Sequence, residues 1–161
     1  MVSLIAAMAK NRVIGKSGKM PWHIPSELRH FRELTLGKVV VMGRKTYEGL
    51  PGSLDGRQIV VLSRSKTYHQ NGVITCRNFS EVWKSFQEEP EIVIAGGAEI
   101  YKQAIDIADS LYLTVIDREY EGDVFFPDFS KKEYLLLSQT EVPGVLETDL
   151  PGYTCYTFKK L

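Results

Sequence analysis

At 161 residues, with 43% apolar and 25% charged side chains, the chain is the size of one domain that folds around a single core. Its 20 Lys and Arg residues balance 20 Asp and Glu residues, so no overall field favours nucleic acid or an anionic membrane as a partner. Cys76 and Cys155 form no CxxC motif, which indicates packing residues in a reducing compartment and argues against a zinc site.

The chain begins with an apolar run at residues 2–9. This run is too short to span a membrane and no basic region precedes it, so we expect a buried strand rather than an anchor or a signal peptide. A long irregular stretch follows at residues 10–24. Pro25 and Gly37 then mark the two ends of a helix that we expect over residues 25–36.

Short β-branched runs alternate with helical patterns along the middle of the chain. The further strands that we expect cover residues 39–42, 59–62, 73–76, 92–95 and 111–116. The helical segments between them cover residues 45–50, 79–88 and 98–108. Such alternation specifies a mainly parallel sheet with helices on both faces. The sequence therefore predicts an α/β fold, with residues 1–161 in a single domain.

The pattern changes toward the C-terminus. Residues 134–142 and 153–159 read as two strands with no helix between them, which predicts an antiparallel hairpin at one edge of the sheet. Before them lies a second long irregular stretch, residues 117–130. Irregular stretches of this length are usually functional or mobile, and the first of them leads directly to Glu27, so we expect it to cover that acid as a lid.

Glu27 lies on the apolar face of the first helix. It precedes Phe31 by four residues and Leu34 by seven, so the three side chains share one face. A glutamate in a first helical turn is usually solvated and favours the helix dipole. A carboxylate enclosed by Trp22, Leu28 and Phe31 would instead lose hydration, which would raise its pKa. Perturbed acids of this kind mark candidate functional sites.

Turns after the expected parallel strands carry glycines or cations. Gly96 and Gly97 follow one strand, where backbone amides suit a phosphate, although a tight turn alone often needs such glycines. The other turns hold residues 42–46, residues 62–65 and Arg77. Each arginine taken alone is more typical of a solvated loop. Because the carboxyl ends of parallel strands lie along one edge, the turns together indicate a ligand with several phosphates.

Other candidate groups are less informative. Arg57 precedes a strand, and it could pair with a ligand carboxylate or lie along the surface, which the sequence alone favours. His23, His30 and His69 form no cluster, so we assign none of them to a metal or to nucleophilic catalysis. The dinucleotide fingerprint G-x-G-x-x-G and the nucleophile elbow G-x-S-x-G are both absent.

Short blocks of sequence occur in the order that they have in one known family. They cover residues 3–7, 13–15, 20–22, 41–46, 56–57, 96–101, 113–114 and 121–127. Through these blocks nearly the whole chain closely resembles dihydrofolate reductase. Any single block could arise by chance, whereas the ordered set is highly specific.

The resemblance implies an eight-stranded sheet with four main helices and an NADPH-dependent reduction of 7,8-dihydrofolate to 5,6,7,8-tetrahydrofolate, a step of one-carbon metabolism. In this family the acid at the position of Glu27 binds the 2-amino group and N3 of the pterin, supported by the hydroxyl of Thr114. A hydride passes from the nicotinamide to C6, and a proton reaches N5 through a water near Met20 and Trp22. The cofactor carries the harder chemistry, so a lone carboxylate suffices.

The resemblance also implies two binding surfaces, in a cytoplasmic monomer that antifolate inhibitors bind. The implied substrate residues are Ile5, Ala7, Leu28, Phe31, Arg32, Leu50, Arg57 and Ala95, with Arg57 on the α-carboxylate of the glutamate tail. The implied cofactor residues are Ala7, Ile14, Gly15, Gly43, Arg44, Lys45, Thr46, Ser63, Arg64, Arg77, Gly96, Gly97, Ala98, Glu99, Ile100 and Tyr101. Of these, Arg44, Ser63, Arg64 and Arg77 would hold the adenosine 2′-phosphate, which favours NADPH over NADH.

The sequence departs from the family pattern at a few positions. Most bacterial members have Asp where this chain has Glu27, a larger aliphatic residue is common at Ala95, and Gly49 replaces a common Ser. Residues 51–55 also differ from the usual pattern before Gly56. Deleting a few methylenes from a pocket typically changes binding by about 1–3 kcal/mol, so these departures bear on antifolate selectivity more than on the reaction.

Two alternatives remain open. A pyrimidine reductase of riboflavin synthesis resembles the same fold and uses NADPH, but its sugar-phosphate substrate would not require Trp22, Glu27 and Arg57 together. A non-catalytic folate-binding or nucleotide-binding module would retain the fold without turnover. Retention of both the acid and the phosphate turns disfavours such a module, and the sequence alone does not decide the point.

Overall fold

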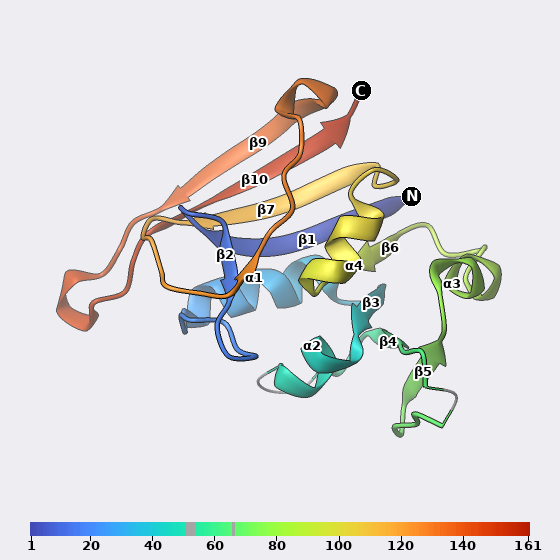
Figure 1. Cartoon of the computed structure of the whole chain (residues 1–161). Helices are drawn as coiled ribbons and strands as arrows, with labels where there is room; N and C mark the ends of the chain where they lie inside the picture. The colour runs from blue at the N-terminus through green and yellow to red at the C-terminus, as the bar shows by residue number, and fades with distance from the viewer. Residues whose placement is uncertain (51–53, 66) are drawn as a thin grey trace.

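An eight-stranded sheet forms the centre of the molecule, in the order β5-β4-β3-β6-β1-β7-β10-β9 (Figure 1). The computed structural model describes residues 1–50, 54–65 and 67–161; residues 51–53, part of the unusual stretch before Gly56, lie outside it, as does Lys66. The strands of the sheet are β1 (Val2–Ala9), β3 (Val39–Gly43), β4 (Gln58–Leu62), β5 (Val73–Cys76), β6 (Ile92–Ile94), β7 (Ser110–Ile116), β9 (Tyr134–Val142) and β10 (Tyr153–Lys160).

The six strands from β5 to β7 in this order are parallel to one another, whereas β10 is antiparallel to both β7 and β9. This arrangement confirms the predicted parallel sheet with an antiparallel hairpin at its C-terminal edge. The central strands are buried except at half-buried end residues of β3 and β4, as expected for parallel strands covered on both faces. No helix in the described part of the chain is long and apolar enough to cross a membrane.

The described residues hold four α-helices, as predicted: α1 (Pro25–Thr35), α2 (Arg44–Gly49), α3 (Phe79–Ser85) and α4 (Ala98–Ala104). One-turn 3-10 helices occur at Lys131–Glu133 and Leu146–Thr148. We predicted that α3 ends at residue 88 and α4 at residue 108, whereas the helices end earlier, at Ser85 and Ala104. For α4 the reason is that buried Ile105 and Ala108 extend the apolar pattern into the turn that follows the helix.

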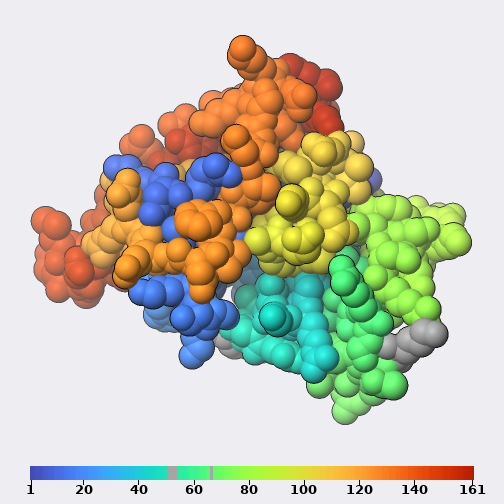
Figure 2. Space-filling model, viewed as in Figure 1, coloured from blue at the N-terminus to red at the C-terminus, as the bar shows by residue number. Residues whose placement is uncertain are grey.

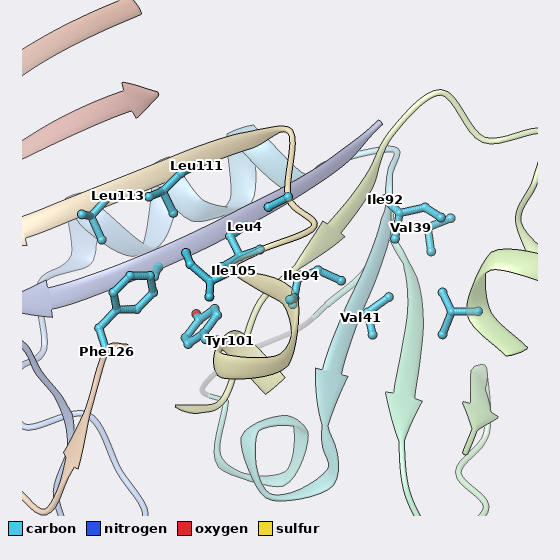
Figure 3. Packing of buried hydrophobic residues seen from close by; sticks show 14 of the residues in the cluster. Leu4, Val39, Val41, Ile92, Ile94, Tyr101, Ile105, Leu111, Leu113 and Phe126 are labelled. Atoms are coloured by element: carbon cyan, nitrogen blue, oxygen red, sulfur yellow. The ribbon is translucent and has the colours of Figure 1, made fainter. Parts of the chain in front are cut away.

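The helices cover opposite faces of the sheet, with α1 behind it and α4 in front in Figure 1. Alternate side chains of β3 point to opposite faces of the sheet and join different core clusters. Val39 and Val41 belong to the core cluster that contains Tyr101 of α4 and Ile105 directly after it, and Figure 3 shows this packing. Val40 and Met42 belong to the cluster against which α2 packs, through Tyr47. Each β3 side chain therefore joins the core on one side or the other.

The two long stretches that we expected to be irregular contain a second, small sheet. β2 (Val13–Gly15) pairs antiparallel with β8 (Val124–Phe125). The backbone amide of Phe126 donates to the Arg12 carbonyl oxygen at 2.9 Å, and this buried ring extends the link into the core. The prediction was wrong here because strands of two or three residues are too short to show an alternating pattern. The two stretches therefore brace each other beside the first turn of α1.

A polar cluster lies at the end of the sheet where the parallel strands begin. Buried Glu91 accepts hydrogen bonds from Ser3 at 2.5 Å and Tyr112 at 3.3 Å, and it pairs with Lys38 at 2.6 Å. Burial alone would raise the pKa of Glu91, but the donors Lys38 and Ser3 hold that pKa below its usual value. This acid is thus fully engaged in holding the structure together.

Gly122 lies where the two small-sheet segments approach most closely. A Cβ at this position would collide with the Val13 side chain and come within 2.6 Å of the Gly15 carbonyl oxygen. We expect Gly122→Ala to lower the free energy of unfolding by about 1–3 kcal/mol, because the backbone must shift. Urea denaturation checks this, with Gly49→Ala as control, since a Cβ there meets its nearest atom at 3.4 Å. Equal stability of the two variants would contradict the close approach.

Candidate active site

Glu27 is the buried acid that the sequence singled out. It lies in the first turn of α1, its side chain is 7% exposed, and burial raises its pKa from 4.5 to about 7. The Glu27 carboxylate makes no hydrogen bond or ion pair with any residue that the structure describes. Unlike Glu91, it is therefore a buried acid available to a ligand.

The other residues predicted to be catalytic are Thr114, Trp22 and Met20. Thr114 is buried on β7, and its hydroxyl donates to the Cys155 sulfur at 3.7 Å. Burial raises the pKa of the Cys155 thiol, the hydrogen bond from Thr114 opposes this, and the charge of Glu27 adds to the rise. Trp22 is also buried, and Met20 packs against the same apolar cluster.

The indole of Trp22 presents an unused donor. Its ring lies 5.4 Å from that of Tyr120, centroid to centroid, at a tilt of 53°. Its Nε1 atom is buried and has no hydrogen-bond partner among the described residues. A buried N–H without a partner costs stability, so an orphaned donor at this place favours a ligand or a water as its partner.

Tyr101 of α4 is hydrogen-bonded to the backbone of β1. Register pairing of β1 with β6 ends at Leu4 and Ile94, and the next carbonyl of β1, that of Ile5, accepts a hydrogen bond from the Tyr101 hydroxyl at 2.7 Å. Burial, and then the charge of Glu27, raise the pKa of Tyr101, which keeps the hydroxyl protonated as a donor. Tyr101 therefore fixes β1 where the strands separate.

The predicted phosphate turns do lie side by side at the carboxyl edge. Gly43 of β3 is paired with Leu62 of β4, and Leu62 is paired with Cys76 of β5. Arg44, Ser63 and Arg77 are the residues that follow these paired positions, as three of the predicted phosphate ligands. Three neighbouring strands thus end in adjacent cationic or hydroxyl side chains.

The fourth turn adjoins them from β6. The Gly43 amide donates to the Gly96 carbonyl oxygen at 2.9 Å, and the peptide bond between Gly96 and Gly97 is cis. A Cβ on Gly97 would lie 3.0 Å from the Thr46 hydroxyl oxygen, and one on Gly96 would lie 3.1 Å from the Tyr101 hydroxyl oxygen. Only glycine allows the backbone and these hydroxyls to stay this close, so the turn forms a cradle of backbone and hydroxyl groups.

Arg57 lies beside the far end of α1, and it does not lie freely along the surface as the sequence alone favoured. Its Nη1 donates to the Thr35 hydroxyl at 3.3 Å, and its guanidinium carbon is 6.0 Å from the centre of the Phe31 ring. Burial and then the positive charge of Arg32 lower the pKa of Arg57. Two arginines therefore stand together at the end of the helix opposite Glu27.

The remaining predicted residues divide by exposure. Half-buried or buried positions around the apolar walls are Ile5, Ala7, Ile14, Gly15, Leu28, Leu50, Ala95, Ala98 and Ile100. Exposed positions are Arg32, Lys45, Arg64 and Glu99. In Figure 2 the surface is hollowed where the blue N-terminal segment meets α2, in cyan, and α4, in yellow.

Two neighbours of the site were not foreseen from the sequence. Cys155, predicted as a packing residue, also accepts the Thr114 hydrogen bond. Tyr68 carries the guanidinium of Arg44 on its ring, 4.6 Å from the ring centre. Neither residue belongs to a motif, and no local pattern would reveal either contact, because both partners lie far apart in the chain.

A cavity of about 300 Å³ lies elsewhere, between α1 and the C-terminal hairpin. His30, Leu34, Thr140 and Thr157 are among its lining residues. None of the predicted site residues lines it, although Cys155, the hydrogen-bond partner of Thr114, does.

These features are typical of an α/β enzyme that has a buried acid and, at the carboxyl ends of its strands, turns predicted to bind phosphate. The chain matches the family model described as dihydrofolate reductase over residues 1–158. It is 40% identical over 155 residues to dihydrofolate reductase type 3 of Salmonella typhimurium, which covers 96% of this chain and 94% of that protein.

Further relatives agree. The chain is 45% identical over 132 residues to a dihydrofolate reductase of Haemophilus influenzae, with 82% of each chain covered. A solved structure of dihydrofolate reductase from Enterococcus faecalis, complexed with NADP(H) and RAB-propyl, is similar with a TM-score of 0.91 at 33% identity; the match covers 99% of this chain and 96% of that one. The chain belongs to the dihydrofolate reductase family, which favours that assignment over the pyrimidine reductase.

The raised pKa of Glu27 makes stability depend on pH. The folded protein holds this proton up to a pH of about 7, whereas the unfolded chain releases it near 4.5, so stability should fall as pH rises between these values. At 1.36 kcal/mol per pH unit the loss is about 3 kcal/mol. We therefore expect Glu27→Gln to be more stable than wild type at pH 8, with the advantage shrinking toward pH 4.5.

Urea denaturation of the ligand-free protein at several pH values measures this difference. Glu33→Gln is the matched control, because Glu33 lies exposed on the same helix. The control should track the wild type at every pH. A difference between Glu27→Gln and wild type that stayed constant from pH 4.5 to pH 8 would refute the raised pKa.

Proposed function

We propose how this chain performs the reaction of its family, the NADPH-dependent reduction of 7,8-dihydrofolate to 5,6,7,8-tetrahydrofolate. The observation that carries the proposal is the buried Glu27 carboxylate in the first turn of α1, which has no partner among the described residues. A small molecule with hydrogen-bond donors satisfies such an acid, and a phosphate-bearing cofactor satisfies the turns.

The residues present fit NADPH. The glycine cradle of Gly96 and Gly97, with Thr46 beside it, leaves backbone and hydroxyl groups close together, as a pyrophosphate requires. Arg44, Ser63, Arg64 and Arg77 would hold the 2′-phosphate. Ala7, Ile14 and Gly15 would contact the nicotinamide, and the rest of the cofactor surface would come from Gly43, Lys45, Ala98, Glu99, Ile100 and Tyr101. When bound, NADPH supplies the hydride that reduces C6 of the substrate.

The substrate would lie along α1. Glu27 would accept hydrogen bonds from the 2-amino group and N3 of the pterin, with Thr114 behind it. Thr35, where Arg57 is anchored, lies eight residues along the helix from Glu27, which corresponds to about 12 Å. This length separates the pterin end of the site from the cations that would bind the α-carboxylate of the glutamate tail.

The walls of this groove would come from apolar side chains. Leu28 and Phe31 project from α1, and Leu50 and Ala95 pack against the cluster beneath α2. Ile5 and Ala7 of β1 would form the floor, held in place by the bond from Tyr101 to the Ile5 carbonyl. Arg32 would add charge beside Arg57. Excluding water from this groove strengthens the hydrogen bonds to the acid.

The proton that N5 receives would come through a water held near Trp22 and Met20. The orphaned Nε1 of Trp22 would fix a water near the reacting atom, and Met20 would close the apolar cluster around it. Glu27, with a pKa of about 7, changes its protonation near neutral pH. Binding a pterin that carries the proton offsets the cost of burying its charge.

We further propose that the enzyme is a cytoplasmic monomer and that antifolates bind the pterin end of the site. Supporting the first point, the acid, the phosphate turns and Arg57 all come from one chain, and both cysteines are free thiols. Supporting the second, the same unpaired acid would accept donors from any pterin-like ring. The extra space beside Ala95 and Gly49 would set inhibitor selectivity.

Oxidation of NADPH by the purified protein, followed by absorbance, tests the reaction. We expect dihydrofolate-dependent loss of NADPH, slower with NADH, and a fall in kcat of about 100-fold or more in Glu27→Gln, because an amide cannot balance a protonated pterin. Glu33→Gln serves as control and should match the wild type. Absence of turnover by folded wild type that binds both ligands would indicate a binding module, and near-normal turnover by Glu27→Gln would refute the proposed role of Glu27.

A second experiment separates the two ends of the site. We expect Arg57→Lys to weaken dihydrofolate binding about ten-fold and to leave NADPH affinity unchanged, because a point charge cannot reproduce the planar fork of arginine. Isothermal titration with each ligand measures both affinities. Arg29→Lys, at an exposed position of α1, is the control. Equal losses for the two ligands would count against the assignment of Arg57 to the substrate tail.

A further inference from the structure

The guanidinium of Arg44 is held on two sides. Its Nε donates to the Glu48 carboxylate at 3.0 Å, one helical turn later in α2. The guanidinium carbon of Arg44 lies 4.6 Å from the centre of the Tyr68 ring. Tyr68 belongs to the connection between β4 and β5. An arginine restrained at both its Nε atom and its flat face has little rotational freedom left.

Core packing and a hydrogen bond to its backbone hold Tyr68 in place. The side chain is 9% exposed and belongs to the cluster that contains Val40, Met42 and Val61. The Thr75 hydroxyl of β5 donates to the Tyr68 carbonyl oxygen at 3.3 Å. Its own hydroxyl oxygen is buried and has no hydrogen-bond partner within the described parts of the chain. The ring, rather than the hydroxyl, is therefore the part of Tyr68 that contacts Arg44.

The two terminal nitrogens of Arg44 remain available. Neither Nη makes a hydrogen bond to a residue that the structure describes. Arg44 follows Gly43, and Ser63 follows Leu62. Because Gly43 and Leu62 are paired in the register of β3 and β4, the Ser63 hydroxyl lies at the neighbouring strand end. A planar fork with its Nε and one face occupied, next to a hydroxyl, suits the bidentate binding of a phosphate monoester.

We propose that Tyr68 is a positioning residue that gives the enzyme its preference for NADPH over NADH. Its ring holds the Arg44 guanidinium in the plane that receives the phosphate on the adenosine ribose. The proposal rests on the proposed function, since it assigns that phosphate to Arg44. The physical gain is pre-organisation, because a restrained arginine loses less conformational freedom when the phosphate binds.

Binding of NADPH and NADH to the purified enzyme, measured by quenching of tryptophan fluorescence, tests this assignment. We expect Tyr68→Leu to weaken NADPH binding about five-fold and to leave NADH binding unchanged, because NADH has no ribose phosphate. Tyr68→Phe retains the ring and should bind both cofactors like the wild type. A general loss of packing would instead weaken both cofactors together, and Arg44→Gln gives the reference loss for the phosphate contact.

The outcomes are separable. An unchanged ratio of NADPH to NADH affinity in Tyr68→Leu, or an equal loss of that ratio in Tyr68→Phe, would overturn the role of the Tyr68 ring. If Arg44→Gln also left the ratio unchanged, the assignment of the phosphate to Arg44 would fall with it. Turnover of dihydrofolate by the wild type with saturating NADPH decides the proposed function independently of either result.

Discussion

The geometry of the site depends on the hydrogen bond from the Tyr101 hydroxyl to the Ile5 carbonyl oxygen. There β1 and β6 stop pairing, and the chain after β6 turns through Gly96 and Gly97 into α4. A parallel sheet that opens at its carboxyl edge leaves backbone groups in need of partners. Tyr101 supplies one of them, and its burial keeps it a donor, so one side chain holds β1 and lies against the turn at Gly96.

Two buried glutamates, Glu91 and Glu27, lie at opposite ends of the parallel strands and differ in their surroundings. Glu91 at the amino edge is surrounded by Ser3, Tyr112 and Lys38, and its charge is stabilised. Glu27 at the carboxyl edge has no described partner, and burial raises its pKa. A satisfied buried acid strengthens the fold, whereas an unsatisfied one lowers stability in exchange for a ligand site.

Much of the fold followed from residue patterns. The alternation of β-branched runs with helical patterns predicted the parallel sheet and its four helices, because a buried parallel strand needs a continuous apolar run. The hairpin of β9 and β10 was also predicted. The pairing of β2 with β8 was not, since so short a strand has no pattern of its own and forms only when a distant segment lies beside it. The end of α4 was misplaced because buried Ile105 and Ala108 continue the apolar pattern into the turn after the helix.

By itself the sequence determined the inward direction of Glu27 and the order of the phosphate turns along the chain, because helical spacing and strand ends are local properties. Only the tertiary structure decided that Glu27 lacks a partner, that Arg57 packs over Phe31, and that Tyr68 lies under Arg44. These facts concern side chains that meet across long sequence separations. Burial and pairing depend on every element that packs around a group, and no local pattern encodes them.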